Sequence, residues 1–142
     1  MPRMTGDEYM EFLTEGTRTA KLATAREDGR PHVVPIWFVM DGEELVFVTS
    51  EQSVKGRNIR REGRVALCVD SSDPPYAFVL IEGTTTTTED QEDLLYWSTR
   101  NAARYVGEAK VEEYGRLNAG EGMMLVRVTP SHVVSENNIT GE

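Results

Sequence analysis

Hydrophobic positions along the chain change from a helical to a strand period close to the N-terminus. Tyr9, Phe12 and Leu13 fall on one face of a helix, and Thr5 is placed to cap its first turn. The next apolar positions alternate with a period of two, which is typical of a half-buried strand. The pattern therefore predicts a short helix that begins at Thr5 and is followed by a strand over residues 19–25.

Strand-like runs and turn signals alternate through most of the remaining chain. Asp28-Gly29 and Asp41-Gly42 are dipeptides typical of tight turns. After five consecutive threonines the period becomes helical again, and Thr88 is the expected N-cap of that helix. Strands are predicted at residues 19–25, 31–40, 44–49, 64–70, 76–87 and 123–134, and the later helices at residues 53–61, 89–106 and 111–119.

Six antiparallel strands with few, peripheral helices predict a mainly β fold, and a small barrel rather than a βαβ arrangement. Closure of the barrel would also remove exposed sheet edges. Pro35 lies inside the second strand and lacks a backbone donor, so it predicts a sheet edge or a bulge. A chain of 142 residues without a long linker or an internal repeat is expected to form one domain over residues 1–142.

The net charge of −9 argues against nucleic acid or an anionic membrane as a partner, because both repel an acidic surface. No apolar run is long enough to span a membrane, and the first residues lack the apolar core of a signal peptide, so the expected location is the cytoplasm. Cys68 is the single cysteine, which excludes an intramolecular disulfide. With only two, distant histidines, a metal site is poorly supported.

Five of the 15 basic residues lie close together, between positions 55 and 64. Ser53 would open the helix that carries the first four of them, and the free N–H groups of a helix N-terminus favour a phosphate. The segment is therefore a candidate anion site. The alternative is a solvated helix face paired with acids such as Glu51 and Glu62, and spacing alone supports both readings equally. The basic residues are Lys55, Arg57, Arg60, Arg61 and Arg64.

The second candidate is the strand that carries His32, Pro35 and Trp37. A bulged strand beside an aromatic residue can present backbone groups to a flat ring. Ordinary core packing is favoured by the residues alone, and a lone strand histidine is more often structural than catalytic. Signatures of other cofactor sites are missing from the sequence: there is no GxGxxG after a strand, no Walker loop and no CxxC.

Several blocks of sequence resemble the flavin/deazaflavin oxidoreductases, the split β-barrel proteins related to pyridoxamine 5'-phosphate oxidase. The longest are residues 22–38, with the turn Asp28-Gly29-Arg30-Pro31, and residues 53–66, which are similar to the family's phosphate-side helix. Shorter matches are Glu82-Gly83-Thr84, Arg104-Tyr105 and Val128-Thr129-Pro130, and all five keep their order over residues 8–134.

Within this superfamily the chain is most similar to the actinobacterial branch that uses the deazaflavin coenzyme F420. The resemblance implies a homodimer with two cofactor sites at the subunit interface. It places Lys55 and Asn58 at the phosphate with Thr49, Ser50 and Arg57 nearby. The ring edge would be lined by His32, Val34, Pro35, Ile36 and Trp37, and covered by Tyr76 and Phe78 of the partner subunit.

The activity that the resemblance implies is hydride transfer from reduced F420 to an electron-poor C=C or C=N bond of a small organic acceptor. No residue stands out as a proton donor, so no catalytic residue is assigned. Two alternatives remain open: an FMN-binding oxidase or flavin-binding protein of the same fold, and a non-catalytic carrier of F420 or haem. The sequence does not identify the acceptor.

Overall fold

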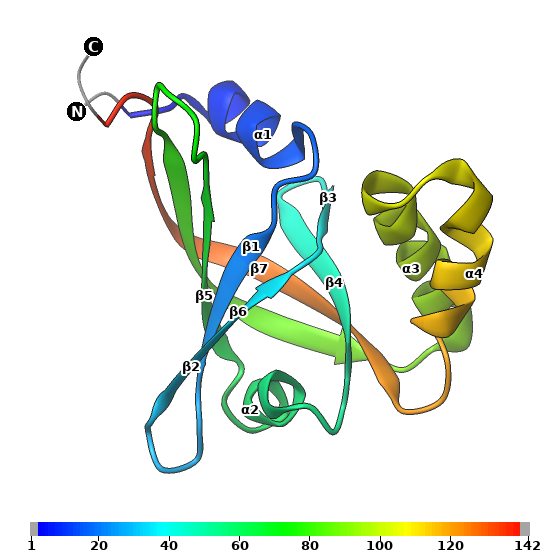
Figure 1. The fold of residues 1–142 in the computed structure, drawn as a ribbon. Coiled ribbons are helices and arrows are strands. Elements are labelled where there is room, and N and C mark those ends of the chain that lie inside the picture. Colours follow the sequence, from blue (N-terminus) through cyan, green and yellow to red (C-terminus); the bar gives the residue numbers. More distant parts are fainter. Residues whose placement is uncertain (1–2, 140–142) are drawn as a thin grey trace.

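The computed structural model describes residues 3–139, and their strands form one seven-stranded antiparallel sheet with helices at its periphery (Figure 1). The strands are β1 (Ala20–Ala25), β2 (Pro31–Ile36), β3 (Val39–Asp41), β4 (Glu44–Ser50), β5 (Arg64–Asp70), β6 (Phe78–Thr88) and β7 (Met123–Glu136). The helices are α1 (Gly6–Thr14), α2 (Val54–Glu62), α3 (Gln91–Tyr105) and α4 (Val111–Leu117), with a 3₁₀ turn over Glu108–Lys110. The predicted mainly β fold with peripheral helices is confirmed.

The sheet has the order β2-β1-β5-β6-β7-β4-β3 and curls around one hydrophobic core (Figure 1). The long strands β6 and β7 pair over almost their whole length, with a register shift between Glu82 and Gly83. Alternation along each strand directs every second side chain inward. Leu22, Phe47 and Leu67 are fully buried in this way.

The single strand predicted over residues 31–40 is wrong, because it is broken into β2 and β3 at Trp37 and Phe38. The N–H of Phe38 donates to the hydroxyl of Tyr105 (3.2 Å), and its carbonyl accepts from Nη1 of Arg104 (2.8 Å). These side chains take the place of strand partners. The predicted six strands therefore become seven.

The closed barrel is also a wrong prediction, since β2 and β3 lie at opposite ends of the sheet and are not hydrogen-bonded to each other. Only the short connection through Trp37 and Phe38 joins the two edges. Pro35, however, was expected at an edge or bulge, and β2 is an edge strand. Pro31 and Pro35 have no N–H to offer, which protects this edge against pairing with another chain.

Helix starts follow the local sequence, with one shift. Thr5 caps α1 as predicted, in a reciprocal capping box with Glu8 (3.1 and 3.0 Å). Thr88 does not cap α3, because it still pairs with Leu125 in the β6–β7 ladder. Asp90 is the N-cap instead, and its carboxylate accepts from a backbone N–H in the first turn (3.1 Å).

The two outer faces of the sheet differ in what covers them. Helix α3 packs on the outside of β4 and β7, where Val46, Leu94, Trp97 and Leu125 form a second apolar cluster. On the other side, α3 and α4 do not reach the outer face of β1, β5 and β6 (Figure 1). Among the described helices none is long and apolar enough to cross a membrane.

Candidate functional site

Part of the basic cluster, which spans α2 and the first residue of β5, is neutralised by nearby acids. Arg60 lies between Glu51 (3.3 Å) and Glu89 (2.5 Å), and Arg64 contacts Glu62. These exposed pairs are of the kind that contributes little to stability. Arg60 and Arg64 therefore fit the interpretation of a solvated, ion-paired surface.

Arg61 and Asn58 belong to a bridge between α2 and β1. The amide nitrogen of Asn58 donates to the hydroxyl of Thr24 (3.0 Å), and its oxygen accepts from Nη2 of Arg61 (3.1 Å). Arg61 also reaches the carbonyl oxygen of Ala25. Asn58 is 4% exposed, so its side chain holds the helix against the sheet. Its predicted contact with a phosphate stays a prediction.

Lys55 and Arg57 differ from the rest of the cluster. Within residues 3–139 neither side chain forms a hydrogen bond or an ion pair with the protein. Arg57 is exposed, whereas Lys55 is half-buried, and this burial lowers the pKa of its ammonium group. A desolvated cation without a partner is costly unless an anion neutralises it. Lys55 is therefore the strongest candidate for an anion contact.

Lys55 lines a cavity of about 280 Å³ between β2, β4, α2 and α3. None of the described residues around this cavity is acidic. Its lining is Pro35, Ile36, Trp37, Val48, Lys55, Ser98, Asn101, Ala102 and Asn118.

The start of α2 brings backbone donors close to Lys55. Ser53 is the N-cap: its hydroxyl accepts from the N–H of Gly56 (3.0 Å) and donates to the carbonyl of Ser50 (2.8 Å). A Cβ on Gly56 would lie 2.2 Å from that carbonyl oxygen, so only glycine allows this close approach. The N–H groups of Val54 and Lys55 make no backbone hydrogen bond and remain available to an anion.

The predicted site residues on β4 lie beside this helix start. Thr49 is buried, and its hydroxyl shares a hydrogen bond with Ser53 (3.1 Å). Ser50 is half-buried, and its hydroxyl accepts from the N–H of Gln52 (3.2 Å). Both residues thus shape the loop before α2, and neither lines the cavity.

Strand β2 divides its predicted site residues between two faces. Val34 and Ile36 point inward, opposite Leu22 and Ala20 of β1, whereas Pro35 points outward. Ile36, Pro35 and Trp37 reach the cavity, but Val34 does not line it. The structure thus brings three of the five predicted ring-edge residues to Lys55.

His32 also points inward, opposite Thr24 of β1. Its Nδ1 is buried and is the one such side-chain atom in the described part of the chain without a hydrogen-bond partner. A buried polar atom of this kind is expected to find a partner. His32 does not line the cavity beside Lys55.

Tyr76 and Phe78, predicted to come from a partner subunit, lie away from this cavity. Tyr76 is 39% exposed and precedes β6, while Phe78 opens β6 and points to the uncovered outer face. Within one chain they do not meet Lys55.

The wall that α3 and α4 add to the cavity was not predicted. Ser98, Asn101 and Ala102 follow one another at helical spacing on α3, and Asn118 follows α4. Two small residues and an amide at positions i, i+3 and i+4 leave room beside a helix. That spacing was the signal available in the sequence.

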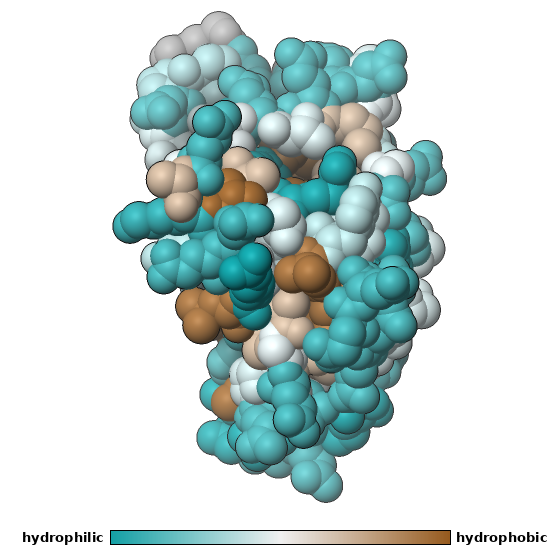
Figure 2. All heavy atoms as spheres, turned by 90° about the vertical axis from the view of Figure 1, so that its right-hand side faces the viewer, coloured by the Kyte–Doolittle hydropathy of each residue, from teal (hydrophilic) through white to brown (hydrophobic). Residues whose placement is uncertain are grey.

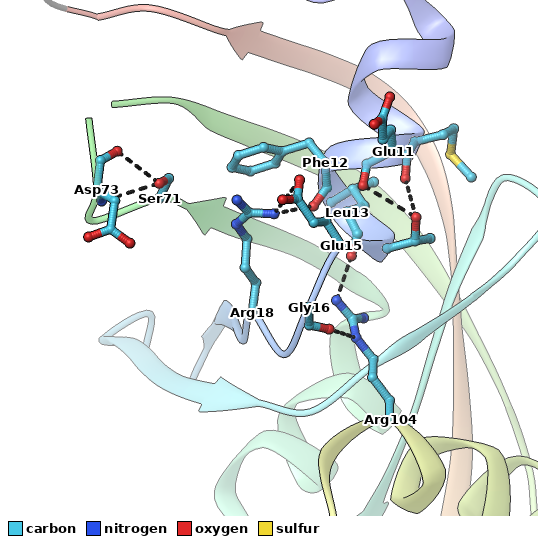
Figure 3. A network of polar contacts seen from close by, with 11 residues as sticks. Glu11, Phe12, Leu13, Glu15, Gly16, Arg18, Ser71, Asp73 and Arg104 are labelled. Carbon is cyan, nitrogen blue, oxygen red and sulfur yellow. Dashed lines mark hydrogen bonds and ion pairs between the residues drawn. The ribbon is translucent and has the colours of Figure 1, made fainter. Parts of the chain in front are cut away.

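Arg104 fixes α3 to the end of α1. Its guanidinium donates to the carbonyl oxygens of Leu13 (2.7 Å), Gly16 (3.0 Å) and Phe38 (2.8 Å), and Figure 3 shows the side chain reaching the first two. The carbonyls at a helix C-terminus attract a cation. Burial lowers the pKa of Arg104, and no carboxylate compensates for it among the described residues.

Tyr105, the next residue, links this end of α3 to Trp37 in the cavity wall. Its hydroxyl donates to the carbonyl of Arg18 (2.7 Å), and its ring stacks on that of Trp37 with centroids 4.9 Å apart and an interplanar angle of 7°. Trp37 is nevertheless 41% exposed. The stack holds one ring face in place and leaves Trp37 available to line the cavity.

A larger cavity, of about 440 Å³, lies beside α1 at another part of the molecule. Its lining includes four carboxylates, Glu8, Glu11, Glu15 and Asp73, and one guanidinium, that of Arg18. Figure 3 shows that Arg18 turns toward Phe12 and Glu15. This cavity is unsuited to a phosphate, which strengthens the assignment of the anion site to Lys55.

The family is decided by residues 5–135, which match the model of the family described as pyridoxamine 5'-phosphate oxidase. The chain belongs to the pyridoxamine 5'-phosphate oxidase family. The predicted resemblance is thereby confirmed, and the match spans all seven strands except Glu136, the last residue of β7.

Solved structures with the same fold differ in what their names say they bind. A conserved hypothetical protein of Mycobacterium tuberculosis has a TM-score of 0.82 at 24% identity, over 94% of this chain and 85% of that one. An F420 reductase has a TM-score of 0.67 at 29% identity, over 87% and 94%. The haem storage protein HutZ of Vibrio cholerae has a TM-score of 0.73 at 21% identity, over 94% and 96%.

Proposed function

We propose that this chain is an F420-dependent oxidoreductase that reduces an electron-poor C=C or C=N bond of a small organic molecule. The observation that carries the proposal is Lys55, a half-buried cation without a partner in a cavity that none of the described acids lines. Family membership supports a flavin-type cofactor, and the similarity to an F420 reductase supports the deazaflavin.

The residues around the cavity fit the phosphate of such a cofactor. The ammonium group of Lys55 and the free N–H groups at the start of α2 would hold it, and Arg57 is exposed close by on the same helix. Pro35, Ile36 and Trp37 would lie along the ring and keep water from it.

Reduced F420, when bound, supplies the hydride, which carries both electrons to the acceptor carbon. The protein's part is then to orient the acceptor and to exclude water. The proton that completes the reduction would come from solvent, since no described side chain is positioned by this structure as its donor. The residues at the cavity thus bind and position, and none is assigned as catalytic.

Fluorescence titration of the purified apo-protein with F420, FMN and haem tests the cofactor. Trp37 lines the cavity, whereas Trp97 of α3 is buried in the apolar cluster against β4 and β7. Binding should therefore quench the fluorescence of Trp37, and a Trp37→Phe variant should show no such quenching. We expect F420 to bind more tightly than FMN or haem. Tighter binding of FMN or haem would reject F420 as the cofactor, and tight F420 binding without turnover of any acceptor would indicate a carrier.

We further propose that two copies of the chain pair through the uncovered outer face of β1, β5 and β6. Ala23, Ala66, Cys68 and Leu80 are half-buried side chains on this face. Pockets that enclose a ligand usually measure about 300–1,000 Å³. The cavity beside Lys55 is smaller, at about 280 Å³, so a second surface would be needed to cover a whole cofactor.

The face formed by α3 and α4 is less suited to pairing. Figure 2 shows it as mainly hydrophilic, with separate apolar patches. Leu95, Tyr96 and Leu117 are the exposed large apolar residues of these helices. Scattered apolar residues of this kind are ordinary on a protein surface.

Ala66→Arg should convert the dimer into a monomer, because it places a long side chain in the middle of the proposed interface, where the parent has only a methyl group. At a protein concentration low enough for the parent to be monomeric as well, the melting temperatures of the variant and the parent should agree within about 3 °C. Light scattering coupled to size exclusion measures the change. Ala103→Arg, at an exposed position on α3, is the matched control. A dimer that survives Ala66→Arg, or dissociates with Ala103→Arg, would reject this interface.

A further inference from the structure

The wall that α3 and α4 add to the cavity carries two asparagine side chains, Asn101 and Asn118. The amide nitrogen of Asn101 faces the carbonyl oxygen of Trp37 (3.4 Å), and that of Asn118 faces the carbonyl of Tyr114 (3.0 Å). Because both partners are acceptors, each nitrogen must face its carbonyl, and the amide oxygen is turned to the other side.

The oxygen of Asn101 has no partner in the protein and yet remains accessible. Asn101 is 5% exposed, and its Oδ1 makes no hydrogen bond with any described residue. It is not among the fully enclosed unpaired atoms of the described chain, where His32 Nδ1 stands alone. Since Asn101 lines the cavity, we expect its accessible Oδ1 to face the interior.

Two neighbours extend this acceptor surface. The hydroxyl of Ser98 gives its hydrogen to the carbonyl of Gly115 (2.6 Å), so only its lone pairs are left for a ligand. Asn118 Oδ1 makes no hydrogen bond with the described residues either. The α3–α4 wall therefore offers neutral acceptors to the same cavity in which Lys55 offers a positive charge.

We propose that Asn101 and Asn118 are specificity-determining residues that accept hydrogen bonds from N–H or O–H groups of the cofactor whose phosphate is held at Lys55. The inference rests on the proposed function and adds the chemistry of the group beside the phosphate: neutral, and rich in donors. An imide N–H of the ring and the hydroxyls of the sugar-alcohol chain are both groups of this class. A ligand that lacks a donor would leave the buried Oδ1 of Asn101 unpaired, which disfavours its binding.

Phosphate-free ligands separate this inference from the proposed function. Riboflavin and the corresponding deazaflavin riboside keep the ring and the hydroxyls but lack the phosphate. Leucine is similar in size to asparagine but has no hydrogen-bond acceptor. Asn101→Leu should therefore weaken, by about tenfold, the binding of whichever riboside the protein binds. Lys55→Met should change riboside binding less than about twofold. It should instead abolish the competition of inorganic phosphate with the phosphate-bearing cofactor.

Asn101→Asp distinguishes an acceptor from a structural contact. Asp keeps an oxygen toward the cavity and removes the donor to Trp37, so riboside affinity should stay within a few-fold of the parent's. If Asp weakens binding as much as Leu does, Asn101 acts by holding Trp37, and the inference is wrong. It is also wrong if Asn101→Leu and Asn118→Leu, with unchanged apo melting temperatures, both bind the riboside normally. If Lys55→Met leaves the competition by inorganic phosphate unchanged, the proposed function is rejected and the inference about Asn101 is unaffected.

Discussion

Lys55→Ala should weaken F420 binding by about 1–3 kcal/mol, which is roughly 5- to 150-fold in the dissociation constant. The loss is that of a charge-assisted hydrogen bond in a partly desolvated cavity. The apo-protein should keep its melting temperature or gain slightly, because Lys55 has no described partner and its burial disfavours the charged form. Fluorescence titration and thermal unfolding measure the two quantities.

Lys110→Ala is the matched control, since it removes an exposed lysine on the 3₁₀ turn, away from the cavity. It should leave cofactor affinity unchanged. Equal affinities of Lys55→Ala and the parent would show that Lys55, like Arg60 and Arg64, is only part of a charged surface.

Arg104→Ala should lower the free energy of unfolding by about 2–4 kcal/mol, which corresponds to a fall in melting temperature of about 5–15 °C. The variant loses three hydrogen bonds from one guanidinium, and it leaves the carbonyls of Leu13 and Phe38 without that donor. Arg104→Lys should recover only part of the loss, since one ammonium group cannot reproduce the forked geometry of the guanidinium. Chemical and thermal unfolding provide the measurement.

Arg100→Ala, one turn earlier on α3, is the matched control. Arg100 is exposed, and among residues 3–139 its guanidinium contacts only the rings of Tyr96 (5.3 Å) and Trp97 (5.6 Å), so its removal should cost no more than about 1 kcal/mol. If Arg104→Ala is no more destabilising than Arg100→Ala, the connection between α3 and α1 does not hold the cavity wall in place.

The order of elements could be predicted because their signals are local. The capping residue Thr5 and the edge proline Pro35 lie in the segments they control, and both behave as expected. The break between β2 and β3 could not be read locally, because Arg104 and Tyr105 cause it from more than 60 residues away. Thr88 does not cap α3 for a similar reason, since its pairing with β7 outweighs its local preference for a helix N-cap.

In the candidate site, too, local sequence signals could be predicted and tertiary contacts could not. The charge cluster located Lys55, but sequence alone could not separate it from Arg60 and Arg64, whose acid partners are defined by the fold. Asn58 is polar in the sequence and was assigned to the phosphate, whereas its bond to Thr24 depends on how α2 packs on β1. The acceptor wall around Asn101 was missed because α3 reaches the cavity only through the tertiary structure.

A crystal structure of the protein with F420 would show directly whether Lys55 holds the cofactor. We expect a phosphate oxygen at about 3 Å from Nζ of Lys55, with the ring beside Trp37. A phosphate bound elsewhere, for example at Arg64 or in the cavity beside α1, with Lys55 making no contact to the cofactor, would contradict it.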